Sequence, residues 1–301
     1  MITKLEDIVK EARQRGRKRL AVACAQDEHT LTAVVEAYRQ GLVLPTLYGD
    51  KAQILSILEK MQVDITDFTV INETDDNASV AMAVRAVAVK EADVLMKGLV
   101  STDKYMRGIL NKEAGLFPPK GVLSHVAVFE MPGYHKLVCI CDAAVIPAPD
   151  FKQKTIMIKY LANIANTLGV ETPKIACIAP SEQVLPSVLS STESAVLAKM
   201  GDRGQLGNVI VDGPLSLDVS LFAEVAKEKK VKGSSVAGDA DCLLFPNIES
   251  ANVFFKSATH FGQAEIAAMV VGTKVPCVLT SRGDTPKTKL YSIALACLSV
   301  R

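Results

Sequence analysis

The stretch LAVACAQDEHTLTAVVEAYRQGLVLPTLY, Leu20–Tyr48, decides the fold class of this 301-residue chain. It opens with Leu20–Ala25, a short apolar run of the kind that forms a strand buried in a parallel sheet. Thr30–Gln40 follows with apolar residues at helical spacing, and Gly41 is suited to end that helix. Leu44–Tyr48 is a second apolar strand. This order predicts a βαβ unit, whose two strands run parallel.

The alternation continues along most of the chain. Helices are expected at Lys51–Lys60, Asn77–Glu91, Ser101–Asn111, Ile156–Leu168, Thr192–Lys199, Leu217–Ala226, from Ile248 onward and at Pro286–Leu298. Strands are expected at Phe68–Ile71, Asp93–Lys97, Lys174–Ala179, Asn208–Val211, Asp241–Phe245 and Val275–Leu279. In the middle, Gly121–Glu130 and His135–Cys141 flank a Met-Pro-Gly turn, which predicts a hairpin. The sequence therefore predicts an α/β fold with mostly parallel sheets flanked by helices.

Length and composition narrow the class of protein. A chain of 301 residues exceeds the size at which single cores stop growing, so two domains are expected, and Asp142–Asp150, with its two prolines, is the natural crossing point. Hydrophobic residues make up 49%, which excludes a disordered chain. A net charge of +1, 5% aromatic residues and no Trp argue against a nucleic-acid-binding protein.

The N-terminal segment and the cysteines indicate the compartment. Acidic and basic residues interrupt every apolar stretch of Met1–Leu20, unlike a signal peptide, and no apolar run reaches the ~18 residues that suggest a membrane span. The seven cysteines are widely spaced and lie mostly in apolar runs. We therefore expect a cytoplasmic protein with buried, reduced thiols.

Candidate site residues follow the predicted strands, because ligands of open parallel sheets bind beyond the carboxyl ends of the strands. They are Lys97-Gly98, Ser181, Asp212-Gly213, Pro246-Asn247 and Ser281-Arg282-Gly283-Asp284. Two of these segments open helices. Ser101 and Thr102 stand at one helix start with Arg107 further along, and Ser281 and Arg282 precede another. Free N–H groups, hydroxyls and an arginine suit a phosphate, although plain helix capping explains each segment taken alone.

Several known signatures are missing from the sequence. It has no phosphate-binding P-loop, and its loosely spaced glycines at 201, 204 and 207 follow a helix instead of a strand, so the dinucleotide fingerprint is not met. The four histidines are scattered and no paired Cys-x-x-Cys occurs. We therefore expect no dedicated metal site.

Four segments, in order, resemble the phosphate acetyl/butyryltransferase family over nearly the whole chain. They are KGLVST with MRGIL and Ser124; CDAAVIPAPD; VDGPLSLDVSL followed by VAGDADCLLFPNIESANVFFK; and the SRG of TSRGDTP. The resemblance implies the reaction acyl-CoA plus phosphate ⇌ acyl phosphate plus CoA. It also implies the fold of isocitrate and isopropylmalate dehydrogenases, with two α/β domains and the active site in the cleft between them.

In that fold the C-terminal helix returns to the first domain. The expected domains are therefore residues 1–142 plus 275–301, and residues 143–274. The short chain and the segment KGLVSTDKYMRG resemble the butyryltransferase branch of the family more than the acetyltransferase branch. In the acetyl branch an Asp thought to act as the base lies seven residues after the motif Ser, where this chain has Thr288. The identity of the base is therefore open.

The resemblance and the chemistry together assign roles. Arg282 and Arg107 would neutralise phosphate and transition-state charge, because a guanidinium fork suits phosphate oxygens. Ser101, Thr102 and Ser124 would bind phosphate oxygens. Ser281 would donate a hydrogen bond to the carbonyl or the thiol. Asp284 is a candidate base or base-orienting residue, and Arg282 with Asn247 would bind CoA.

We expect direct transfer in a ternary complex, with CoA as a substrate, no cofactor, no nucleic-acid or membrane partner, and a homo-oligomer of two or more subunits. Three alternatives stay open: a phosphate acetyltransferase, a metal-dependent NAD(P) dehydrogenase of the related fold, and a CoA- or acyl-phosphate-binding protein without catalysis. Missing paired acidic metal ligands and a missing nucleotide motif count against the dehydrogenase.

Overall fold

A computed structural model describes residues 1–119, 121–281 and 283–300. The chain forms two compact units, which we describe separately. The β1 unit comprises residues 6–121 and 267–301, and the β5 unit comprises residues 1–5 and 122–266. Among the described residues, no helix is both long and apolar enough to cross a membrane.

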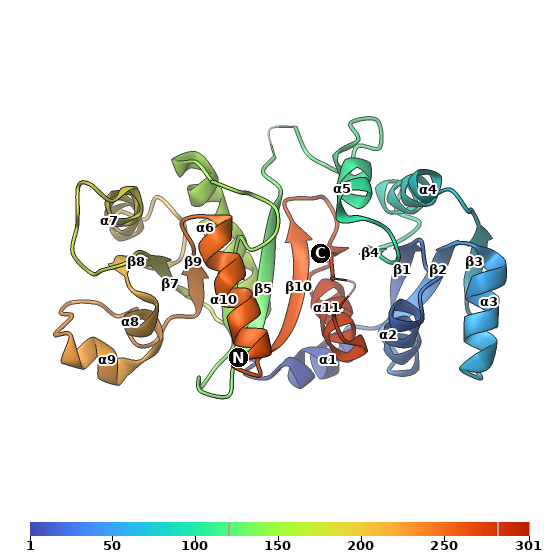
Figure 1. Cartoon of the computed structure of the whole chain (residues 1–301), viewed down its shortest axis with the longest axis horizontal. Coiled ribbons are helices and arrows are strands. Elements are labelled where there is room, and N and C mark those ends of the chain that lie inside the picture. The colour runs from blue at the N-terminus through green and yellow to red at the C-terminus, as the bar shows by residue number, and fades with distance from the viewer. Residues whose placement is uncertain (120, 282, 301) are drawn as a thin grey trace. The chain divides into compact units, whose positions relative to one another are not determined.

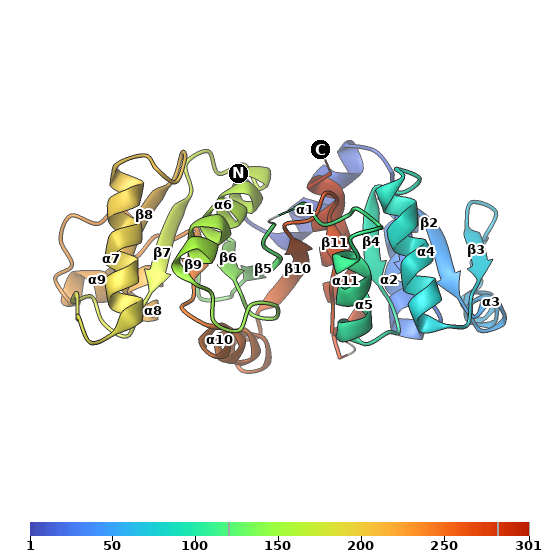
Figure 2. The same ribbon diagram turned by 90° about the horizontal axis from the view of Figure 1, so that it is seen from above.

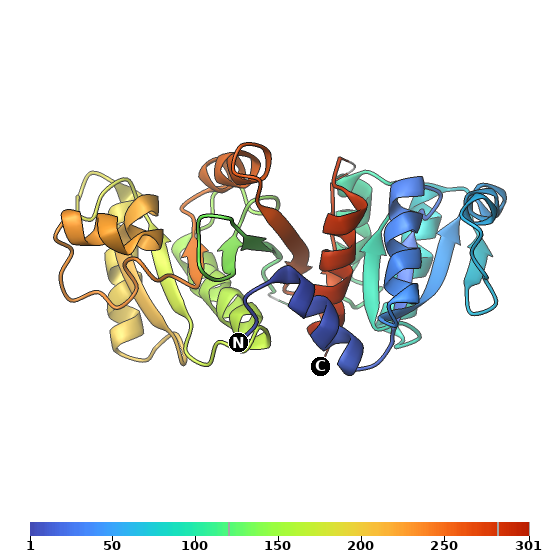
Figure 3. The ribbon, with the colours of Figure 1, turned by 90° about the horizontal axis from the view of Figure 1, so that it is seen from below.

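The β1 unit is built around the predicted βαβ segment. Its strands follow the order β3-β2-β1-β4-β11-β10, in which β11 and β10 pair antiparallel and the other pairings are parallel. Their bounds are β1 Lys18–Ala23, β2 Val43–Gly49, β3 Thr69–Asn72, β4 Val94–Lys97, β10 Glu265–Val271 and β11 Cys277–Val278. The helices are α1 Leu5–Gln14, α2 Glu28–Arg39, α3 Lys51–Lys60, α4 Asp76–Ala88, α5 Thr102–Leu110 and α11 Pro286–Leu298. Figure 2 shows α4 and α5 on one face of this sheet, and Figure 3 shows α2 and α11 on the other.

The β5 unit has the strand order β5-β6-β9-β7-β8 (Figure 1). Its strands are β5 Ser124–Glu130, β6 Val138–Cys141, β7 Lys174–Ile178, β8 Ile210–Leu215 and β9 Cys242–Leu244. Its helices are α6 Phe151–Thr167, α7 Leu189–Asp202, α8 Leu217–Leu221, α9 Ala223–Glu228 and α10 Ile248–His260. The hairpin β5–β6 is antiparallel, as its Met-Pro-Gly turn predicts, and the other pairings are parallel. The mixed α/β class with mostly parallel sheets is confirmed.

Four sequence-based expectations need correction. The strand β10 was not predicted, and β11 spans two residues where Val275–Leu279 was expected. The helix expected at Leu217–Ala226 is interrupted at Phe222, whose extended backbone separates α8 from α9. Asp212 and Gly213 lie inside β8 and do not follow it, because this strand continues past a register shift to Leu215.

The domain ranges predicted from the sequence stay a prediction. The compact units place residues 122–142 with the β5 unit and residues 267–274 with the β1 unit.

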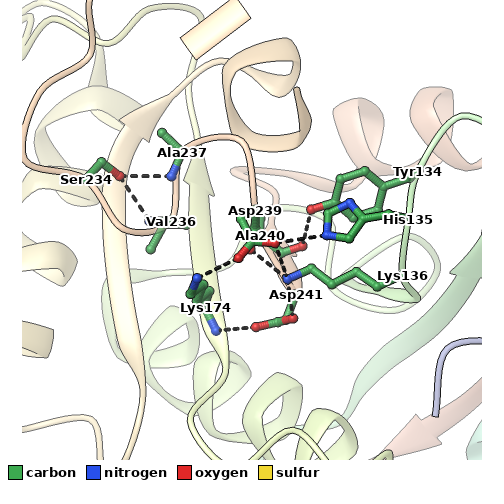
Figure 4. A network of polar contacts seen from close by, with 10 residues as sticks. All are labelled: Tyr134, His135, Lys136, Lys174, Ser234, Val236, Ala237, Asp239, Ala240 and Asp241. Carbon is green, nitrogen blue, oxygen red and sulfur yellow. Dashed lines mark hydrogen bonds and ion pairs between the residues drawn. The ribbon is translucent and has the colours of Figure 1, made fainter. Parts of the chain in front are cut away.

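A network of charged side chains lies at the edge of the β5 unit where β6, β7 and β9 begin (Figure 4). Lys136, before β6, contacts Asp239 at 2.7 Å and Asp241 at 2.8 Å, and Lys174, which opens β7, contacts Asp239 at 2.6 Å. Burial works against the charge of Asp239, but the two lysines outweigh it and lower the pKa of Asp239 to about 2. The network joins three strand starts and lies at the edge opposite to the carboxyl ends, where ligands of such sheets bind.

Candidate active site

Three neighbouring strands of the β1 unit, β1, β4 and β11, end at one edge of the sheet because they run parallel. The chain leaving β4 lies directly against the chain leaving β1: Gly98 N donates to Ala23 O at 2.8 Å, and Leu99 N donates to Cys24 O at 2.7 Å. A Cβ on Gly98 would lie 2.3 Å from Cys24 O, so only glycine fits there. This close approach places the start of α5, with Ser101 as its N-cap, at the carboxyl edge of the sheet.

Ser101 caps the N-terminus of α5, as predicted. Its Oγ accepts a hydrogen bond from Lys104 N at 3.2 Å, and Thr102 is the first helical residue. The free amides and the positive end of the helix dipole favour an anion here. Arg107 lies in the last turn of the same helix, where its exposed guanidinium contacts Asp103 at 2.8 Å. The predicted contact of Arg107 with phosphate stays a prediction.

Ser281 lies in the loop between β11 and α11, with both of its peptide groups bound. Its N–H donates to Asp284 Oδ2 at 2.7 Å, and its carbonyl oxygen accepts from Lys289 Nζ at 2.9 Å. Its Oγ accepts only a long contact from Gly283 N, at 3.4 Å, and within the described residues nothing accepts its hydroxyl proton. That proton is thus available to a substrate. Arg282, predicted to be catalytic, lies outside the described residues.

In the β5 unit, Ser124 is completely buried and its hydroxyl donates to Asp142 Oδ2 at 2.9 Å. The same carboxylate accepts three main-chain N–H groups, from His125 at 2.9 Å and from Ala144 and Val145 at 2.8 Å each. A hydroxyl has one proton, so Ser124 cannot also donate to a phosphate oxygen while it makes this bond. The assignment of Ser124 to phosphate stays a prediction.

Asn247 begins α10 in the β5 unit and acts as its N-cap. Its Oδ1 accepts hydrogen bonds from Ser250 N at 3.0 Å and from Ser250 Oγ at 2.7 Å. The side-chain amide N–H groups of Asn247 have no hydrogen-bond acceptor among the described residues, so they can donate to a ligand. Its predicted contact with CoA stays a prediction.

The structure brings some of the predicted residues together. Ser101, Thr102, Ser281 and Asp284 share the carboxyl edge of the β1 unit, since β4 and β11 are parallel neighbours. Ser124 and Asn247 belong to the β5 unit. Sequence reasoning gave no role to Asp142 or Lys289, although both are buried charged residues with several hydrogen bonds beside predicted site residues.

All seven cysteines are free and buried, as the sequence indicated. Burial raises the pKa of Cys177, Cys277 and Cys297 to about 12. Burial, and then the neighbouring Asp142, raise the pKa of Cys141 well above its ordinary value. A thiol nucleophile must be ionised to attack, so these environments disfavour a cysteine acyl-enzyme.

We therefore expect Cys139→Ala and Cys141→Ala each to retain most of the kcat for acyl transfer between phosphate and CoA. The loss of one buried sulfur would mainly reduce stability, because it leaves a small cavity. Initial-rate measurements at varied concentrations of both substrates check this. Parallel-line plots, or an acyl group on Cys141 seen by mass spectrometry, would contradict direct transfer.

A family model described as Phosphate acetyl/butaryl transferase matches residues 74–297 of the chain. The chain is 42% identical over 298 residues to a phosphate butyryltransferase of Clostridium beijerinckii, with 99% of this chain and 98% of that protein covered. It is 39% identical over 292 residues to a phosphate acetyltransferase of Thermotoga maritima, with 97% of this chain and 98% of that protein covered.

A solved structure shares the fold. The chain superimposes on a branched-chain phosphotransacylase from Enterococcus faecalis with a TM-score of 0.84 and 29% sequence identity. The match covers 94% of this chain and 99% of that one.

Proposed function

This chain belongs to the Phosphate acetyl/butaryl transferase family, and from that membership we propose that it is a phosphate butyryltransferase. It is a phosphate acyltransferase: it interconverts acyl-CoA plus phosphate with acyl phosphate plus CoA. The observation that carries the butyryl assignment is the similarity to a butyryltransferase over nearly the full length of both chains. Phosphate acetyltransferase is the second candidate, because relatives of similar identity carry that name.

In the proposed reaction, the CoA sulfur loses its proton and attacks the carbonyl carbon of the acyl phosphate. The new C–S bond forms first and puts negative charge on the carbonyl oxygen. The C–O bond to phosphate then breaks, and phosphate leaves with the electron pair. Ser281 supports this chemistry because its hydroxyl proton is free to bind the developing oxyanion or the sulfur. Arg282 would neutralise the leaving phosphate. Asp284 would act as the base or orient it.

The phosphate would bind at the N-terminus of α5, where Ser101 and Thr102 offer hydroxyls beside free amides. Arg107 and Ser124 would complete the phosphate contacts, and Asn247 would contact CoA together with Arg282. Both substrates would bind before either product leaves. From the resemblance alone, we also propose an active site in a cleft between the two domains, a homo-oligomer of two or more subunits, and a cytoplasmic location.

The acyl preference is tested by the rate of thiol release from butyryl-CoA and acetyl-CoA in the presence of phosphate. One methylene in an apolar pocket changes kcat/KM by about 10- to 200-fold, so a true butyryltransferase should favour butyryl-CoA at least about tenfold. A preference for acetyl-CoA would make the protein an acetyltransferase. If neither thioester were turned over, the protein would be a CoA- or acyl-phosphate-binding protein without catalytic activity.

Acyl transfer should also survive chelation. Phosphate charge can be neutralised by arginine and helix N-termini, and the described residues hold no group of three or more His, Cys, Asp or Glu that could bind a metal ion. We expect dialysis against EDTA to leave kcat within about twofold of the untreated protein. Loss of turnover that Mg²⁺ or Mn²⁺ restores would contradict a metal-free mechanism.

A further inference from the structure

The two peptide groups of Ser281 are held by side chains of opposite charge. The carboxylate of Asp284 accepts the Ser281 N–H, and the ammonium of Lys289 donates to the Ser281 carbonyl oxygen. Each partner suits the group that it binds, because an N–H is the positive end of the peptide dipole and a carbonyl oxygen the negative end. Asp284 N also donates to the Ser281 carbonyl oxygen at 3.2 Å. The backbone of Ser281 is thus fixed on both sides.

Lys289 is unusual in its burial. Only 3% of the residue is exposed, and it lies on α11 among buried apolar residues. Its Nζ donates a second hydrogen bond to Thr280 Oγ1 at 3.2 Å, and Thr280 is itself buried. Burial lowers the pKa of Lys289, while the charges of Asp284 and Asp27 oppose that shift. Burying an ammonium costs free energy unless hydrogen bonds replace its contacts with water. The burial of Lys289 therefore depends on the hydrogen bonds that it makes inside the protein.

We propose that Lys289 is a positioning residue for acyl transfer, which together with Asp284 clamps the peptide groups of Ser281 and leaves the Ser281 hydroxyl free for the substrate. This inference rests on the proposed role of Ser281. Fixing the backbone through two charged hydrogen bonds sets where the Ser281 Cβ lies, and this limits the hydroxyl to the few positions that its rotamers allow. A donor that is held in place before the reaction need not be reorganised during it. Small misplacements of such groups can lower rates by about 10²-fold.

The first test is Lys289→Met, which keeps the length and apolar stem of the side chain but removes the donor. We expect kcat to fall at least about tenfold while KM for both substrates changes less than about threefold, because the variant misplaces a catalytic donor and leaves the binding groups in place. Lys60→Met is the matched control. Lys60 is an exposed lysine in the last turn of α3, in the same unit, and its loss should leave kcat unchanged.

A double-mutant cycle with Ser281→Ala separates positioning from a purely structural role. If Lys289 acts through the Ser281 hydroxyl, Lys289→Met should lower kcat in the native background and have almost no further effect in the Ser281→Ala background. An equal loss in both backgrounds would overturn the proposal. So would wild-type kcat in a folded Lys289→Met variant.

The single variant Ser281→Ala distinguishes failure of the proposed active site from failure of the Lys289 clamp. Full activity of Ser281→Ala would overturn both the proposed site and the clamp. A strong loss in Ser281→Ala with none in Lys289→Met would overturn the clamp alone. Should Lys289→Met fail to fold, the cycle is run with Thr280→Val, which removes the other partner of the ammonium. We expect Thr280→Val to lower kcat slightly in the native background and to have no further effect in the Ser281→Ala background. An equal loss in both backgrounds would overturn the clamp.

Discussion

Arg282→Ala is expected to lower kcat by about 10²–10³-fold while the protein stays folded. Removing one donor aimed at charge that develops in the transition state typically costs that much. The leaving phosphate gains negative charge as the C–O bond breaks, and the planar guanidinium can hold two of its oxygens at once. Steady-state rates with butyryl phosphate and CoA, together with circular dichroism of the variant, check the prediction.

Two further variants sharpen the test of Arg282. Arg282→Lys keeps the charge but loses the fork, so its kcat should lie between those of the alanine variant and the native protein. Arg203→Ala is the control, because Arg203 is an exposed arginine at the end of α7 that the proposed site does not use. Near-native turnover of Arg282→Ala would show that the site has been assigned to the wrong loop.

The elements that the sequence predicted best are those with strong local signals. The bounds of α3 and α11 are those predicted, since Asp50 and Thr285 cap these helices through local hydrogen bonds and Pro286 fits the first turn of α11. The hairpin β5–β6 was likewise predictable from its turn. In contrast, β10 begins a few residues after α10 ends. The apolar run of β10 has no periodicity that distinguishes a strand from a helix.

The site was predictable only in part. Ser101 and Ser281 could be found because each follows a strand and precedes a helix. The roles of Asp142 and Lys289 depend on partners that the fold brings together, such as Ser124, 18 positions from Asp142. A weak signal did exist for both residues: Asp142 directly follows the apolar run VCIC, and Lys289 precedes the apolar residues of α11. A charge in such a place predicts burial but does not identify its partners.

Asp142→Asn is expected to lower the free energy of unfolding by at least about 2 kcal/mol. Asp142 is 2% exposed, and its two oxygens accept four hydrogen bonds. An asparagine replaces one of these oxygens with an NH₂ group, which would then face donors. The hydroxyl of Ser124 can turn to accept a hydrogen bond, but at least one main-chain N–H is left unpaired. A buried donor without an acceptor costs about 1–3 kcal/mol, and the opposed N–H groups add to that cost.

Urea unfolding of the native protein, Asp142→Asn and Ser124→Ala measures these effects. Ser124→Ala removes one of the four donors and leaves the other three bonds intact, so its loss should be smaller, about 1 kcal/mol. Asp150→Asn is the matched control: Asp150 caps α6 in the same unit, and asparagine caps a helix about as well, so the change should stay below about 1 kcal/mol. If Asp142→Asn were no less stable than Asp150→Asn, the four contacts would not hold this loop. If Ser124→Ala lost activity far beyond its loss of stability, Ser124 would act on the substrate as well as on Asp142.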